Sequence, residues 1–239
     1  MPVFPVTFQA VFTEPDLYGL LRSGFIRNKG VKSKQKGERI EKMAKKPESS
    51  PLARFYYNVV HTPFGEAVVV GRQEGNRFLA IRVMLPQKEG MVSERVAEDF
   101  PGAAYSPTAG VGICSHISKF FEGNDAVFET ADRDAAIVQG FARRVLTKAA
   151  GIPRGFVMTY SGLAVSIGVP GGARAVGNAL AWNPFPLIYP CHRVIRKDGS
   201  LGGFGGGLTL KRSLLEMEGV FFDRQGKVLQ KNIREGGMM

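Results

Sequence analysis

The residues best suited to chemistry are a neighbouring pair, Cys191 and His192, which follow a proline-rich run that begins at Asn183. Three prolines in this run restrict the backbone and remove amide donors, so an extended approach to the cysteine is expected. A lone cysteine in an apolar stretch is usually an inert core thiol. Here His192 and Arg193 follow it directly, and positive neighbours lower a thiol pKa and enrich the nucleophilic thiolate. The pattern therefore indicates a reactive cysteine.

The spacing of the pair limits how the histidine can help. Adjacent side chains of a strand point to opposite faces, so His192 can assist Cys191 only through a tight turn or a bridging water. The second cysteine, Cys114, lies in an unrelated context, and the histidines show no paired spacing with either thiol. Two reduced cysteines, with no zinc or other metal site, are therefore expected.

Helices are predicted on both sides of the Cys–His segment. Upstream, Thr159–Ile167 and Ala173–Trp182 are two short helices across a glycine-containing turn, which suggests a helix-turn-helix, and a longer helix is predicted from Asp132. Downstream, a helix over Leu208–Met217 follows a loop, residues 199–207, that has six glycines in nine residues. Because glycine lets a chain close over a flat group at little steric cost, this loop is expected to form the wall of a pocket.

The chain ahead of these helices is typical of a small sheet. Alternating and β-branched runs predict strands at 55–60, 66–71 and 77–85, followed by helices at 92–99 and 114–121. The expected fold is a two-domain α/β protein, in which a small antiparallel-sheet domain precedes a mainly helical domain with the helix-turn-helix. The predicted divisions are a basic extension at 1–50, the α/β domain at 51–125, the helical domain at 126–225 and a tail at 226–239.

Charge indicates the kind of partner. The 239 residues carry a net charge of +11, and Arg27–Lys46 alone holds nine lysines and arginines against two glutamates. Such a balance favours a polyanion, most commonly nucleic acid, although a solvated surface would read the same way. No apolar run is long enough for a membrane span and no secretory signal is recognisable, so a soluble cytoplasmic protein is expected, nuclear in a eukaryote.

The segment Pro190–Val194 resembles the active-site motif of the O6-alkylguanine-DNA alkyltransferases. The resemblance spans about residues 135–220, and further blocks stand at that family's intervals on both sides of the cysteine. Upstream these are Tyr160, Ala173–Gly177 and Asn183–Pro184; downstream they are Gly199, Gly202, Gly206, Gly207, Lys211, Leu214, Leu215, Glu218 and Gly219. Several separated blocks in register make the resemblance specific.

The resemblance implies DNA repair by irreversible alkyl transfer. Cys191 would take the alkyl group from O6-alkylguanine in duplex DNA and keep it, so each chain would act once, as a monomer and without any cofactor. His192 would accept the thiol proton through a water, Glu218 would orient His192, and Asn183 would stabilise the turn that carries the cysteine. Activity on O4-alkylthymine is left open.

The same resemblance assigns DNA contacts and a substrate pocket. The helix-turn-helix would enter the minor groove, where Arg174 would fill the place of the flipped base and Tyr160 would crowd the 3′ phosphate. Three small residues of the second helix, Ala173, Ala175 and Gly177, would let it lie close to the groove. The pocket would be formed by Pro186, Arg193, Val194, Leu201, Phe204, Gly205 and Lys211.

One departure and several alternatives accompany this hypothesis. Phe204 stands where many members carry a tyrosine whose hydroxyl helps protonate the leaving guanine, and Gly205 replaces a serine, which predicts slower transfer. A related protein that recognises alkylated DNA without repairing it would lack the cysteine. A helix-turn-helix regulator would need more base-reading side chains than the second helix offers. A Cys–His hydrolase would need a histidine distant in sequence.

Overall fold

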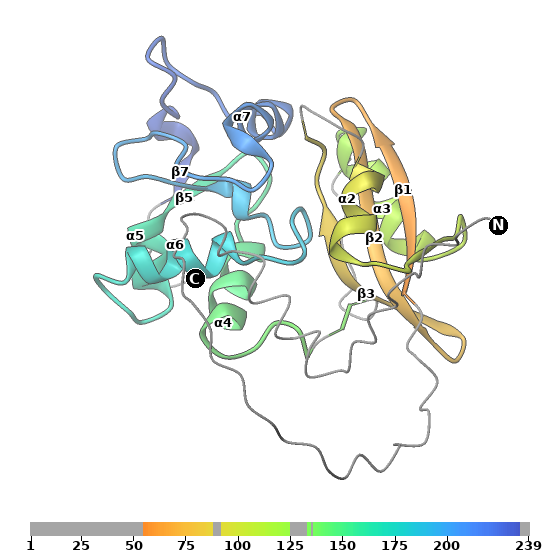
Figure 1. Cartoon of the computed structure of the whole chain (residues 1–239). Helices are drawn as coiled ribbons and strands as arrows, with labels where there is room; N and C mark the ends of the chain where they lie inside the picture. The colour runs from red at the N-terminus through yellow and green to blue at the C-terminus, as the bar shows by residue number, and fades with distance from the viewer. Residues whose placement is uncertain (1–54, 88–91, 125–132, 135, 235–239) are drawn as a thin grey trace, which may run out of the picture. The chain divides into compact units, whose positions relative to one another are not determined.

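The computed structural model describes residues 55–87, 92–124, 133–134 and 136–234 (Figure 1). The chain divides into two units, Met1–Ser50 and Pro51–Met239. The first unit, with the basic arm predicted at Arg27–Lys46, lies outside the described residues, and so does the predicted boundary at 125/126. No helix within the described ranges is both long enough and apolar enough to cross a bilayer.

A four-stranded sheet forms the first part of the second unit. Its strands are β1 (Phe55–Thr62), β2 (Gly65–Glu74), β3 (Arg77–Met84) and β4 (Ala104–Tyr105), in the order β3-β2-β1-β4. The first three strands are antiparallel, and β4 runs parallel to β1. Two helices pack on the sheet, α2 (Val92–Asp99) against β2 and α3 (Val111–Phe121) against β1. The apolar run 67–70 of the central strand is therefore completely buried.

The second part contains the predicted helices and a small sheet. Its elements are α4 (Gly140–Ala150), β5 (Val157–Thr159), α5 (Tyr160–Ser166), α6 (Ala173–Ala181), the 3-10 helix η2 (Cys191–Arg193), β6 (Val194–Ile195), α7 (Gly207–Met217), the 3-10 helix η3 (Gln230–Asn232) and β7 (Ile233–Arg234). The strands are parallel, in the order β6-β5-β7. A buried cluster of Val157, Ile195, Leu215, Val220 and Val228 holds this sheet to α7.

The two short helices predicted as a helix-turn-helix are present. Thr159 caps α5, because its hydroxyl accepts a hydrogen bond from the amide of Gly162 at 2.9 Å. Gly168 takes a left-handed conformation (φ +75°) directly after the helix and lets the chain turn toward α6. Helices α5 and α6 pack on each other and on α4. The sheet before them delivers Tyr160 at the first position of α5.

Two boundaries differ from the sequence-based expectation. The helix predicted from Asp132 begins at Gly140, because Gln139 is extended and Gly140 has a φ of +57°. Of the predicted tail at 226–239, the structure describes residues 226–234. Val228 enters the core, and β7 adds a third strand beside β5. A two-residue strand has too short a pattern to be recognised in a sequence.

Asn232 fastens this C-terminal segment to the rest of the domain. The side chain is buried, its amide donates to the carbonyls of Gly155 (2.9 Å) and Gly219 (3.4 Å), and its oxygen accepts from the amide of Phe221 (3.2 Å). Asn232→Ala leaves these three groups without a partner, so we expect the free energy of unfolding, measured with urea, to fall by about 2 kcal/mol. Gln230→Ala, an exposed position on the same 3-10 turn, is the control. Equal unfolding curves for the two variants would show that Asn232 does not anchor the segment.

Candidate active site

Cys191, the predicted nucleophile, lies in a tight turn that Asn183 holds. Residues Cys191–Arg193 form the 3-10 turn η2, and the Asn183 amide donates to the carbonyl of Tyr189 (2.8 Å) and to Sγ of Cys191 (3.2 Å). The Asn183 oxygen accepts the amide of Phe185 at 3.0 Å. Within this loop Leu187 has a φ of +71°, the one positive φ at a non-glycine residue in the described ranges. The extended approach expected from the prolines is therefore a compact loop around Asn183.

His192 and Glu218 meet in the interior, 26 positions apart in sequence. The ring of His192 is fully buried, and its Nε2 lies 3.0 Å from Oε1 of Glu218. Glu218 is the C-cap of α7, so the helix ends where its carboxylate reaches the ring. The 3-10 turn gives Cys191 and His192 the tight geometry that a strand would not allow.

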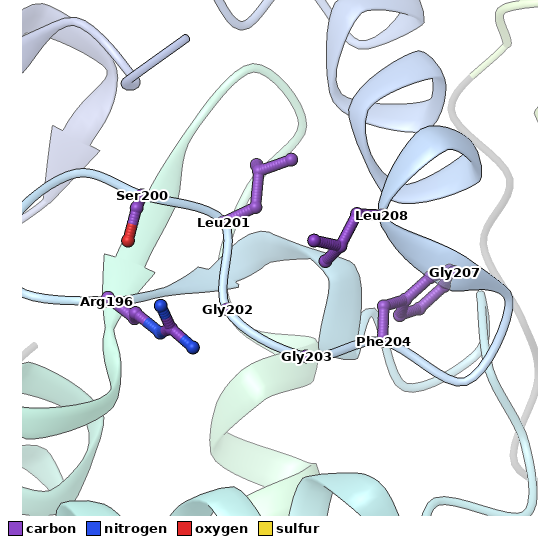
Figure 2. A pocket seen from close by; sticks show the side chains of 8 residues that line it. All are labelled: Arg196, Ser200, Leu201, Gly202, Gly203, Phe204, Gly207 and Leu208. Carbon is purple, nitrogen blue, oxygen red and sulfur yellow. The ribbon is translucent and has the colours of Figure 1, made fainter. Parts of the chain in front are cut away.

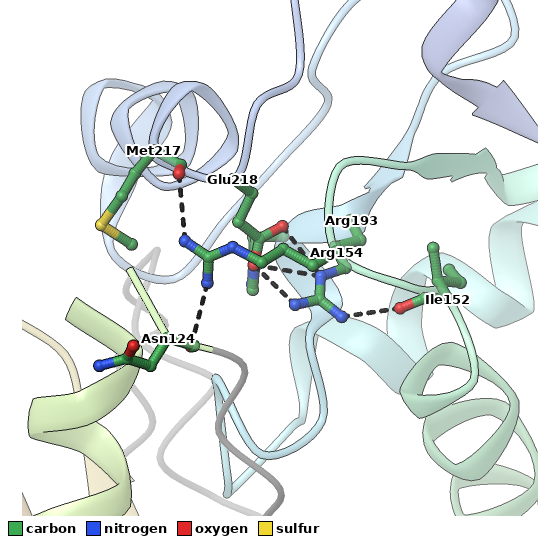
Figure 3. A network of polar contacts seen from close by, with 7 residues as sticks. Asn124, Ile152, Arg154, Arg193, Met217 and Glu218 are labelled. Atoms are coloured by element: carbon green, nitrogen blue, oxygen red, sulfur yellow. Dashed lines mark hydrogen bonds and ion pairs between the residues drawn. The ribbon is translucent and has the colours of Figure 1, made fainter. Parts of the chain in front are cut away.

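Arg193 completes this ion cluster (Figure 3). Its guanidinium donates to both oxygens of Glu218, at 2.7 Å to Oε1 and 2.9 Å to Oε2, and to the carbonyl of Ile152 at 2.7 Å. Burial by itself would raise the pKa of Glu218, but the attraction of His192 and Arg193 outweighs it and lowers that pKa to about 2. Glu218 is therefore a carboxylate at every ordinary pH.

The free nitrogen of His192 is suited to accept a proton. Burial lowers the pKa of His192 despite the opposing pull of Glu218, so the ring is neutral at pH 7. With Nε2–H donated to the Glu218 carboxylate, the lone pair lies on Nδ1. Nδ1 is buried and has no hydrogen-bond partner in the described part of the chain. The rings of Phe120 and Phe204 approach the imidazole edge-on, with centroids at 5.9 and 6.3 Å.

The side chains that favour a thiolate are not those next to Cys191 in sequence, although backbone hydrogen bonds at Cys191 and His192 also lower the thiol pKa. Burial raises the pKa of the Cys191 thiol, whereas the hydrogen bond from Asn183 and the charge of Lys211 lower it. His192 is neutral, and the charge of Arg193 is paired with Glu218. The depression of the thiol pKa that was expected from the side-chain charges of these two neighbours is not found, because the fold directs both side chains to the glutamate.

Lys211 is a fully buried cation between the nucleophile and the glycine-rich loop. Its Nζ donates to the carbonyls of Val194 (2.6 Å), Leu201 (2.6 Å) and Gly203 (3.4 Å). Burial lowers its pKa to about 8, although the nearby Cys191 acts in the opposite direction. The ammonium both fixes the loop and places a positive charge near the sulfur.

A cavity of about 320 Å³ opens at the glycine-rich loop (Figure 2). It is lined by Arg196, Ser200, Leu201, Gly202, Gly203, Phe204, Gly207 and Leu208. Of the predicted pocket residues, Leu201 and Phe204 lie on this lining. Five others do not: Pro186 is buried in the nucleophile loop, Val194 and Lys211 bond to each other, Arg193 binds Glu218, and Gly205 is exposed.

The predicted DNA-contacting residues lie on α5 and α6. Tyr160 is half-buried and packs against Gly202, where an added Cβ would lie 2.9 Å from the tyrosine ring. Gly177 of α6 also faces the Tyr160 ring. Arg174 and Ala175 are exposed near the start of α6, and Ala173 is half-buried. Tyr160 therefore connects the helix-turn-helix to the cavity, while Arg174 stands on the surface.

The first sheet supports the nucleophile loop through contacts that the sequence did not reveal. The Val83 amide of β3 donates to the carbonyl of Pro184 at 2.9 Å, and the Arg133 guanidinium lies 4.7 Å from the ring centre of Tyr189. Arg154 donates to the carbonyls of Asn124 and Met217 and so ties the end of α3 to the end of α7 (Figure 3). Each of these contacts joins segments that are distant in sequence, so no local sequence pattern predicts them.

Comparison with known proteins is consistent with this geometry. The family model described as 6-O-methylguanine DNA methyltransferase, DNA binding domain, matches residues 140–220. The methylated-DNA–protein-cysteine methyltransferase of Mycolicibacterium paratuberculosis is 34% identical over 162 residues, 68% of this chain and 91% of the relative. That of Salmonella typhimurium is 40% identical over 126 residues, 53% and 68% of the two chains. In Methanothermobacter thermautotrophicus a like-named relative is 44% identical over 119 residues, half of this chain and 66% of the relative.

Solved structures resemble the chain at the level of the fold as well. The Mycobacterium tuberculosis O6-methylguanine methyltransferase superposes with a TM-score of 0.55 at 31% identity, over 69% of this chain and 93% of that chain. The same protein solved in complex with DNA gives a TM-score of 0.55 at 32% identity, over 69% and 92% of the two chains.

Proposed function

Since the chain belongs to the methylated-DNA–protein-cysteine methyltransferase family, we propose that it repairs DNA by moving an alkyl group from O6-alkylguanine to Sγ of Cys191. One observation supports this most strongly. Asn183 holds the Cys191 sulfur, and next to it a neutral His192 is bound to an ionised Glu218, beside a cavity that adjoins the helix-turn-helix. These groups are the ones expected around an activated cysteine that lies next to a DNA-binding element.

The proton of the thiol leaves first. With Nε2 engaged by Glu218, Nδ1 of His192 takes the proton through a water molecule, and the Glu218 carboxylate stabilises the imidazolium that forms. The Asn183 amide and the Lys211 ammonium stabilise the thiolate. The arrangement follows the logic of a hydrolase triad, in which an acid orients a base that activates a nucleophile.

The alkyl group then moves in a single displacement. The sulfur forms a bond to the alkyl carbon as the bond between that carbon and O6 of guanine breaks, and the guanine leaves with the electron pair and takes up a proton. The products are a thioether on Cys191 and unmodified guanine. A thioether offers no leaving group to a residue of the site, so each chain acts once.

Access to the lesion requires DNA binding and base flipping. Helices α5 and α6 would bind the minor groove of the duplex, with the small residues of α6 close to the sugars. The alkylated guanine would leave the stack at a cost of a few kcal/mol, with Arg174 in the vacated place and Tyr160 at the neighbouring phosphate. The described residues need no second copy to complete the site, and we propose that the chain acts as a monomer.

Stoichiometry tests the proposal. When the protein is titrated with an excess of duplex carrying one O6-methylguanine, we expect methyl transfer to stop at one group per chain, because the acceptor sulfur is consumed. The measurement is the lesion remaining by nucleoside analysis at several protein concentrations. Continued loss of lesion beyond one equivalent would show turnover and would contradict transfer to the protein.

Phe204 limits the rate of the displacement in which the alkyl group moves to Cys191 and guanine leaves. It lines the cavity and its ring is edge-on to His192, but it has no hydroxyl to donate to the leaving guanine. Phe204→Tyr is expected to raise the single-turnover rate up to about tenfold, the value of one neutral hydrogen bond formed in the transition state. Phe221→Tyr, at an exposed ring outside the site, is the matched control. An unchanged rate in Phe204→Tyr would show that a hydroxyl at this position does not assist the departure of guanine.

A further inference from the structure

Arg196 is a cation at the edge of the cavity that the mechanism above does not use. It directly follows β6 and lines the cavity with the glycine-rich loop. Figure 2 shows its side chain beside Gly202, with Phe204 and Leu208 at the other end of the lining. In the part of the chain that the structure describes, its guanidinium has no hydrogen bond or ion pair to another side chain or carbonyl.

The backbone of Arg196 is fixed although its guanidinium is free. Its amide donates to the carbonyl of Ser200 at 2.8 Å, and its carbonyl accepts the amide of Gly199 at 3.1 Å. Asp198, the acidic residue of the same turn, accepts hydrogen bonds from the amide and the hydroxyl of Ser200, at 3.1 and 2.7 Å. The carboxylate nearest in sequence is therefore engaged elsewhere in the turn, and the positive charge of Arg196 remains available.

Arg196 also stands beside the groups that would receive the lesion. A Cβ added at Gly202 would lie 2.9 Å from the Tyr160 ring and 3.4 Å from Cγ of Arg196, so Gly202 separates the two side chains by little more than its own width. The charge of Arg196 acts on Tyr160 and on Lys211, in each case in the direction that lowers the pKa. The Arg196 side chain thus lies beside Gly202 and Tyr160, on the lining of the cavity that would receive the base.

The chemistry of this position fits a phosphodiester. A nucleotide that has left the stack brings its own phosphates to the rim of the pocket that holds its base. A guanidinium binds phosphate through two parallel N–H donors, and it does so best where no carboxylate competes. Three other side chains of the lining, Leu201, Phe204 and Leu208, are apolar and suit the flat base.

We propose that Arg196 binds a backbone phosphate of the strand that carries the flipped guanine and so holds the base in the cavity. The inference rests on the proposed function and adds a contact outside the helix-turn-helix. In this arrangement the apolar side chains of the cavity contact the base, and Arg196 binds the phosphate of the backbone.

Two substrates distinguish a phosphate contact from a role in the cavity. One is duplex DNA with a single O6-methylguanine; the other is the free base O6-benzylguanine, which has neither sugar nor phosphate. We expect Arg196→Ala to lower the single-turnover rate on duplex at limiting DNA by about tenfold, a loss typical of a charge-assisted hydrogen bond. The loss on the free base is expected to be much smaller. For duplex binding, the slope of log K against log salt concentration is expected to become shallower by about 1, the change that corresponds to the loss of one phosphate contact.

Lys197→Ala is the matched control, because Lys197 is an exposed cation on the same turn that does not line the cavity. It is expected to change both rates by no more than about twofold. If Arg196→Ala slowed transfer equally on duplex and on free base, or had only the small effect of Lys197→Ala, the phosphate contact would be overturned. The proposed function would not be affected by that result. Failure of the unaltered protein to take an alkyl group from either substrate would overturn the proposed function together with the phosphate contact.

Discussion

Glu218→Gln is expected to slow alkyl transfer by about a hundredfold or more. The neutral amide could still accept a hydrogen bond from Arg193, but it would no longer carry the charge that stabilises a protonated His192 when the thiol gives up its proton. Loss of one member of a positioned acid–base pair typically costs two to four orders of magnitude. The measurement is the single-turnover rate on duplex with one O6-methylguanine, followed over the pH range 5 to 9.

The same substitution has a signed effect on stability. Because the folded-state pKa of Glu218 is about 2, below its ordinary value of 4.5, ionisation of this group contributes stability that is fully present above pH 4.5. That contribution is lost as the pH falls from 4.5 toward 2. The free energy of unfolding of the unaltered protein should therefore approach that of Glu218→Gln at low pH and exceed it at pH 7.

Glu216→Gln provides the control for both measurements. Glu216 lies two residues away on α7, is exposed, and pairs with Arg212 at 2.8 Å in an i,i+4 arrangement. Its removal is expected to cost about 0.5 kcal/mol or less and to leave the transfer rate unchanged. A Glu218→Gln protein as fast as Glu216→Gln would mean that His192 acts without the carboxylate.

Lys211→Met is expected to lower the transfer rate at pH 7 by about tenfold or more. It removes the positive charge that lowers the Cys191 pKa and leaves the carbonyls of Val194 and Leu201 without their donor. The thiol pKa then rises, so the pH at which the thiolate forms moves upward. The rate of Cys191 alkylation by iodoacetamide against pH reports this directly, and Cys114 adds little, since burial raises its pKa to about 11.

The stability of the Lys211 variant should change in the alkaline range. The pKa of Lys211 is lowered to about 8 in the fold from 10.5, so the unfolded chain binds more protons between these values. The free energy of unfolding of the unaltered protein therefore rises with pH from 8 to 10.5, and this rise is absent in Lys211→Met. Arg212→Met, an exposed neighbour on the same helix, should retain it. If the pH profile of Cys191 alkylation were the same in Lys211→Met as in the unaltered protein, Lys211 would have no part in activating the thiol.

Local signals in the sequence were sufficient for most elements. Thr159 before an apolar turn, and glycines at 168 and 171–172, delimit α5 and α6 as predicted, since capping and left-handed turns are properties of a few adjacent residues. The pairing of His192 with Glu218 could be proposed only from the resemblance. They are 26 positions apart with a helix between them, and no periodicity specifies which carboxylate meets the ring.

Charge and burial were the features least accessible from the sequence. Arg193 lies two positions after Cys191, but its guanidinium points to Glu218 and Ile152, so proximity in sequence misrepresented the electrostatics of the thiol. Lys211, which the resemblance assigns to the substrate pocket, is fully buried behind the cavity lining and donates to the carbonyls of Val194 and Leu201. Asn232 and Arg154 act through backbone carbonyls of distant segments, and such contacts depend on tertiary packing rather than on residue type.

The most direct test of alkyl transfer to Cys191 is the mass of the intact protein, with peptide mapping, after incubation with duplex DNA containing one O6-methylguanine. Cys114→Ser and Cys191→Ser serve as paired controls, because they remove the buried thiol and the proposed acceptor in turn. We expect a gain of one methyl group on Cys191 in the unaltered protein and in Cys114→Ser, and none in Cys191→Ser. A protein that binds the lesion tightly without gaining mass, or that gains the methyl group at another residue, would contradict this expectation.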